Sequence, residues 1–95
     1  MKTAVSPEQR IQGAIDIADR VVELASQQGV QLDGYAWAPD PSREKRPAEY
    51  YYLIISAGPK HCEAKFSRTL LEDRPAGAST AVRSVLEEMV RAVKG

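Results

Sequence analysis

The first third of the chain carries apolar residues at helical spacing. Ser6 and Pro7 suit the N-cap and the first helical position, and Gln9 completes a capping-box pattern with Ser6. Gly29 stands where a left-handed residue commonly ends a helix. The pattern therefore predicts a helix between Ser6 and Gly29, with an apolar stripe that consists of Ile11, Ala14, Ile15, Ala18, Val21, Val22 and Ala25 and is widened by Ile17 and Leu24.

Three segments with strand character follow. We expect strands over residues 30–37, 49–57 and 60–70, the second because it is aromatic and β-branched and the third because it alternates. Gly58-Pro59 turns the chain between the last two. Gly34 weakens the first strand and is typical of a bulge. The face expected to be covered carries Leu32, Ala36, Leu53, Ile55, Cys62, Ala64 and Phe66, with Tyr51 on the same side as Leu53.

The rest of the chain is expected to form two connections and a second helix. Residues 38–48 contain three prolines and a polar run, so we expect a loop there, and residues 71–77 form the second connection. Helical spacing returns from about Ala78 to Lys94, with an apolar stripe of Val82, Val85, Leu86, Met89, Val90 and Val93.

The order helix, strand, strand, strand, helix indicates an α+β fold. Short connections make consecutive strands neighbours, which predicts a three-stranded antiparallel sheet. Both helices are then expected to pack on one face of that sheet. The length of 95 residues fits a single domain over residues 1–95.

Composition narrows the classes of function. The formal net charge is zero, with 13 basic and 13 acidic residues, whereas a dedicated nucleic-acid-binding domain normally has a basic surplus. No stretch approaches the roughly 20 apolar residues of a membrane span, and the start of the chain lacks the apolar run of a signal peptide. Cys62 is the only cysteine, which excludes an intramolecular disulfide. We therefore expect a cytoplasmic protein that does not bind or span a membrane.

Candidate chemistry is sparse. His61 and Cys62 are adjacent on a predicted strand, so their side chains should diverge rather than form a Cys–His dyad. A single histidine and a single cysteine do not make a structural zinc site. Residues 76–80 offer backbone N–H groups before a helix, but without a lysine they do not resemble a nucleotide-binding loop. The sequence predicts no catalytic residues, no metal ligands, no cofactor and a protein that is not an enzyme.

One predicted surface indicates a partner. The expected strand phases place several aromatic and apolar side chains on the sheet face away from the helices, bordered by Lys65: Tyr35, Trp37, Tyr50, Tyr52 and Ile54. Three interpretations fit this set: a protein contact or self-association surface, a platform for single-stranded bases, or core residues in a strand of inverted phase. Zero net charge favours protein contact over nucleic acid, and a homodimer is its simplest form.

The alternative is an RNA- or single-strand-binding domain that uses Arg43, Lys45 and Arg46 of the first loop. The element order resembles the topology of double-stranded-RNA-binding domains, which would imply RNA contact by that loop and by the start of the second helix. Those domains place a lysine-rich cluster there, whereas residues 76–83 contain no lysine. The resemblance is therefore one of topology, and the first hypothesis is a small interaction module.

Overall fold

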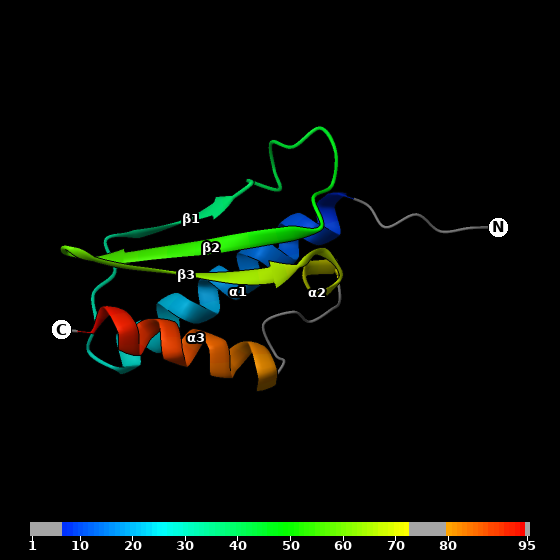
Figure 1. Ribbon diagram of the computed structural model, residues 1–95. Helices are drawn as coiled ribbons and strands as arrows, with labels where there is room; N and C mark the ends of the chain where they lie inside the picture. The colour runs from blue at the N-terminus through cyan, green and yellow to red at the C-terminus, as the bar shows by residue number, and fades with distance from the viewer. Residues whose placement is uncertain (1–6, 73–79, 95) are drawn as a thin grey trace.

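The computed structural model describes residues 7–72 and 80–94. The elements follow the order α1 (Pro7–Gln27), β1 (Gly34–Ala38), β2 (Tyr50–Ala57), β3 (Lys60–Ser67), α2 (Arg68–Glu72) and α3 (Thr80–Val93). The three strands form one antiparallel sheet in the order β1-β2-β3, and the helices lie on one side of it (Figure 1). The predicted α+β class and strand topology are confirmed.

Local sequence explains the C-terminal end of α1 and the tight turn between β2 and β3. Gly29 has a φ of 73° and follows α1, and the N–H of Val30 bonds to the carbonyl of Ala25 at 2.8 Å, as in a Schellman cap. Gly58 has a φ of 62° in the turn between β2 and β3. Its N–H bonds to the Asp33 carboxylate, which ties this turn to the start of β1. The N-cap expected at Ser6 lies outside the described residues, and so do residues 76–79 of the predicted helix start.

The core fills the space between the sheet and the helices. From the sheet it takes Tyr51, Leu53, Ile55 and Phe66, which form one cluster with residues of the helices. The helices add Ala14, Ile17, Val21, Leu24, Ala25, Leu71, Val82, Leu86, Met89, Val90 and Val93. The buried side of α1 is therefore turned toward Ile17 and Leu24, and leaves Ile15 and Val22 each 43% exposed. Val85, expected within the stripe of the second helix, is 38% exposed.

The predicted phase of the first strand is wrong. Tyr35 pairs with Ile55 and Trp37 with Leu53, so both aromatic side chains lie on the helix side of the sheet, whereas Ala36 pairs with Ile54 on the other side. The strand starts at Gly34 rather than at residue 30. The N–H of Asp33 bonds to the carbonyl of Ser56, whose register partner is Gly34. Two residues thus face one, as in a β-bulge, and the alternation that begins at Val30 shifts by one position.

The end of the third strand also differs from the prediction. The strand stops at Ser67 instead of continuing to about residue 70, and α2 replaces the start of the expected connection. The hydroxyl of Ser67 accepts the N–H of Leu70 at 3.3 Å, which is an N-cap arrangement. Leu71 is fully buried one turn later. The cap and this apolar anchor favour a helical turn over a longer strand.

Candidate functional site

The uncovered face of the sheet brings four of the six predicted partner-binding residues together. We call them the open-face patch: Tyr50, Tyr52 and Ile54 of β2 and Lys65 of β3. Register places Lys65 opposite Tyr52, and β2 alternates between these residues and the buried Tyr51, Leu53 and Ile55. The side chains of Tyr50 and Tyr52 are 45% and 38% exposed. Two aromatic rings therefore stand in solvent on a face that no described helix covers (Figure 1).

Lys65 contacts the Tyr50 ring of the open-face patch. Its ammonium Nζ lies 4.1 Å from the centroid of the Tyr50 ring, which is a cation–π contact. At an exposed site such a contact contributes about 0.5–1 kcal/mol. It also occupies one of the two faces of that ring. A base that stacked on this face of Tyr50 would have to displace the ammonium.

The two remaining predicted residues lie apart from the patch, at the junction of β1 and α1. Trp37 packs on the core, and its ring centroid is 5.8 Å from that of Phe66. Tyr35 is 47% exposed and lies between two shallow hollows. We call this junction the α1–β1 seam; its apolar side chains are Ile11, Ile15, Val22, Tyr35 and Trp37. Among the described residues, the indole N–H of Trp37 has no hydrogen-bond partner.

The basic loop residues proposed for nucleic acid are exposed and lie between β1 and β2. Arg43, Lys45 and Arg46 all face solvent. Arg43 reaches the carboxylate of Asp40 only at 3.9 Å. Hydrogen bonds from the hydroxyl and the backbone N–H of Ser42 lower the pKa of Asp40, which keeps this carboxylate charged. The loop therefore carries both signs of charge.

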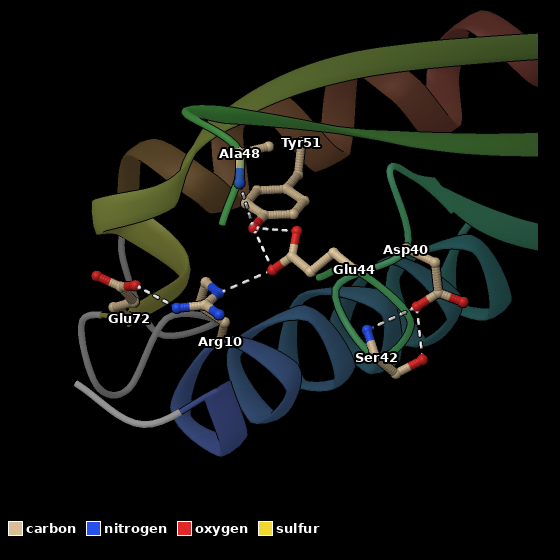
Figure 2. Close-up of polar contacts among 7 residues, drawn as sticks. All are labelled: Arg10, Asp40, Ser42, Glu44, Ala48, Tyr51 and Glu72. Atoms are coloured by element: carbon tan, nitrogen blue, oxygen red, sulfur yellow. Dashed lines mark hydrogen bonds and ion pairs between the residues drawn. The ribbon is translucent and has the colours of Figure 1, made fainter. Parts of the chain in front are cut away.

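A buried polar network, which the sequence analysis did not predict, fixes the loop against α1. The guanidinium of Arg10 lies between Glu44 of the loop and Glu72 of α2, at 3.0 Å from each carboxylate (Figure 2). The hydroxyl of Tyr51 donates to Glu44 at 2.6 Å and accepts the N–H of Ala48 at 3.1 Å. Glu44 thus points inward from a run whose other charged residues point outward. No sequence motif distinguishes it from its neighbours Arg43 and Lys45.

The network shifts the pKa values of two of its members. Burial by itself lowers the pKa of Arg10, but the hydrogen bonds to Glu72 and Glu44 outweigh it and leave this pKa raised. Burial raises the pKa of Tyr51, and the hydrogen bond to the Glu44 carboxylate raises it further. At neutral pH the Arg10 guanidinium therefore stays protonated and charged, and the Tyr51 hydroxyl stays protonated and neutral. The network joins α1, the loop, β2 and α2.

The histidine and the cysteine lie on opposite faces of β3. His61 pairs with Ser56 and is exposed, whereas Cys62 pairs with Ile55 and packs against the core. Their side chains diverge, as expected for neighbours on a strand. Within residues 7–72 and 80–94, no three histidine, cysteine, aspartate or glutamate side chains gather in a way that could hold a metal ion. In the same ranges, no helix is both long enough and apolar enough to cross a membrane.

The fold and these surfaces define a small α+β domain whose sheet is covered on one face and open on the other. Comparison with protein-family models, with curated proteins and with solved structures gives no significant match. Function is therefore argued from the residues of this chain alone.

Proposed function

We propose that the protein is a small, non-catalytic interaction module that binds a second copy of itself through the open-face patch. The observation that carries the proposal is the exposure of Tyr50 and Tyr52, side by side with Ile54, on the uncovered face of the sheet. Aromatic side chains are enriched at the centre of protein interfaces and bury a large area there. Exposed apolar groups that adjoin one another are typical of contact sites.

A second copy suits this face because its charges are self-complementary. Along β3 the open face carries His61, Glu63 and Lys65 in succession. In a two-fold arrangement, Glu63 of one copy is able to approach Lys65 of the other. The zero net charge of the chain also minimises repulsion between copies. A homodimer therefore needs no partner of different composition.

The patch favours protein over nucleic acid. Stacked bases need ring faces and phosphates need a surplus of positive charge. One face of Tyr50 is occupied by Lys65, and the basic loop contains Asp40 beside Arg43. These features support the protein hypothesis. We keep the cytoplasmic location as part of this proposal.

Sedimentation velocity at rising protein concentration tests the dimer. We expect the wild-type protein to dimerise at high micromolar concentration, and Tyr52→Glu to remain monomeric because it places a charge in the centre of the interface. Tyr35→Glu is the matched control, since Tyr35 is also exposed, at 47% against 38% for Tyr52, but lies on the other side of the sheet. Equal behaviour of the two variants would refute the open-face interface. Binding of RNA that weakens with salt and is lost when Arg43, Lys45 and Arg46 become alanine would favour the alternative.

A further inference from the structure

The two edges of the sheet differ in their protection against strand pairing. β1 and β3 are both edge strands, each with one neighbour. The open edge of β3 carries charged side chains, among them Lys60, Glu63 and Lys65. β1 has the sequence Gly-Tyr-Ala-Trp-Ala, with no charge and no proline over its five residues. Natural proteins blunt edge strands with charge or proline, so β1 is the edge left open to another strand.

The sheet also ends before it covers the outer side of α1. Ile15 and Val22 of α1 lie below the free edge of β1 and are both exposed, and Tyr35 stands beside them. A hollow of about 510 Å³ lies on one side of Tyr35, lined by Val22, Ser26, residues 29–32 and Gly34. A hollow of about 150 Å³ lies on the other side, between Ile15 and Trp37. One more strand beyond β1 would lie over this apolar surface.

From these observations we propose that the α1–β1 seam binds an extended peptide, which adds to the free edge of β1 as a fourth strand. The backbone of β1 supplies hydrogen bonds to the peptide backbone, and these bonds do not depend on peptide sequence. Alternate side chains of the peptide point toward α1 and contact Ile15, Val22 and Tyr35. This occupant therefore has apolar residues at every second position.

The charges that border the seam specify the rest of the peptide. Asp19 lies one helical turn from both Ile15 and Val22, and Glu8 lies one turn before Ile11. Both are exposed, and among the described residues neither forms an ion pair. Asp40, just after β1, lines the smaller hollow and has Arg43 near its carboxylate only at 3.9 Å. An acidic border of this kind favours basic side chains at the peptide positions that point to solvent.

The same border disfavours a second copy at this edge. A two-fold pairing of β1 with β1 would bring α1 of each copy, and with it Asp19, toward α1 of the other. Like charges brought together in this way oppose association. The seam and the open-face patch lie on different sides of the sheet, so the two proposals stand or fall separately.

Fluorescence titration of the full-length protein tests the seam, because Trp37 is the only tryptophan and lines it. The probe is the peptide Lys-Val-Lys-Val-Lys-Val-Lys. We expect it to bind, and expect the analogue with glutamate in place of lysine to bind at least about tenfold more weakly. An analogue N-methylated at alternate residues, which cannot extend the backbone ladder, should lose binding.

Two exposed valines provide matched variants. Val22→Lys should weaken peptide binding by about tenfold or more, because it places a positive charge in the seam, where it repels the basic peptide. Val85→Lys on α3, at similar exposure, should bind as the wild type does. Circular dichroism checks that both variants are folded before the titration. The proposal is overturned if the two variants bind the peptide with equal affinity, or if the acidic peptide binds as well as the basic one. It is also overturned if Val22→Lys abolishes a dimer.

Discussion

Tyr51 shows how one residue joins the core to the polar network. Its ring is fully buried between the sheet and the helices, and its hydroxyl bonds to both Glu44 and Ala48 (Figure 2). The pKa of Tyr51 is raised from its ordinary value of 10.0, first by burial and then by the Glu44 carboxylate. The folded protein therefore holds this proton more tightly than the unfolded chain does.

The raised pKa of Tyr51 predicts that the folded protein loses stability at alkaline pH. The contribution is complete below about pH 10 and is lost as pH rises from there through the raised pKa, since the unfolded tyrosine ionises first. Tyr51→Phe should lower the unfolding free energy by about 1–3 kcal/mol at neutral pH, because Ala48 and Glu44 lose a partner. Above about pH 10 the gap between wild type and variant should narrow. Urea unfolding across this pH range measures both effects.

Tyr52→Phe is the control for this experiment. Its hydroxyl belongs to an exposed side chain on the other face of the same strand. It should change neither the neutral stability nor the alkaline profile. A gap between wild type and Tyr51→Phe that stays constant through the alkaline range would contradict the assigned role of the Tyr51 hydroxyl.

At the level of elements, α2 is seated directly on α1 at Gly13. A Cβ atom placed on Gly13 would lie 1.9 Å from the carbonyl oxygen of Leu71. The obstacle is backbone, so no side chain can rotate out of the way. The position therefore requires glycine for close approach of two helices, and the Arg10–Glu72 pair lies one turn away.

Gly13→Ala reverses the usual rule for helices. Alanine in an exposed helix interior is favoured over glycine by about 1 kcal/mol. Here α2 must move away from α1, and the expected result is a destabilisation of about 1–3 kcal/mol. Gly34→Ala is the control, since nothing lies within 4 Å of its Cβ position. Thermal unfolding distinguishes the two, and a Gly13→Ala protein more stable than wild type would show that the helices do not touch there.

At the level of the whole molecule, one hydrophobic core joins the sheet to the helices. Leu53 lies at the centre of the middle strand and is fully buried. The same core contacts Trp37 at the edge of the sheet and includes residues of all three helices. Because no element has a separate core, we expect the described part of the chain to unfold as one unit.

Leu53→Ala tests this unit. The cavity should lower the unfolding free energy by about 2–5 kcal/mol. Ile54→Ala on the open face of the same strand should cost about 1 kcal/mol or less. In both variants, Trp37 fluorescence and far-ultraviolet circular dichroism should report one midpoint in urea. Separate midpoints for the two probes would mean that the sheet edge and the helices unfold independently.

The sequence predicted some positions of the candidate site correctly and others wrongly. The parity of β2 and β3 follows from their own alternation, so the open-face positions of Tyr50, Tyr52, Ile54 and Lys65 were predictable. Tyr35 and Trp37 were assigned to the wrong face, because one shifted position at Asp33 and Gly34 moves every later side chain of the strand. The α1–β1 seam was therefore not predicted, and neither was the network around Arg10.

Local patterns alone determined the order of the three strands and the two long helices, the antiparallel sheet and most of the core, but not the short α2. Hydrophobic spacing and turn residues act over a few positions in the chain. Only the tertiary structure decided which charged residues turn inward and which apolar residues stay exposed. Glu44 is buried because Arg10 and Tyr51, far away in sequence, converge on it. Ile15 and Val22 are exposed because the sheet ends above them at β1. Both outcomes depend on which distant segments of the chain come to lie together, and local periodicity does not determine that.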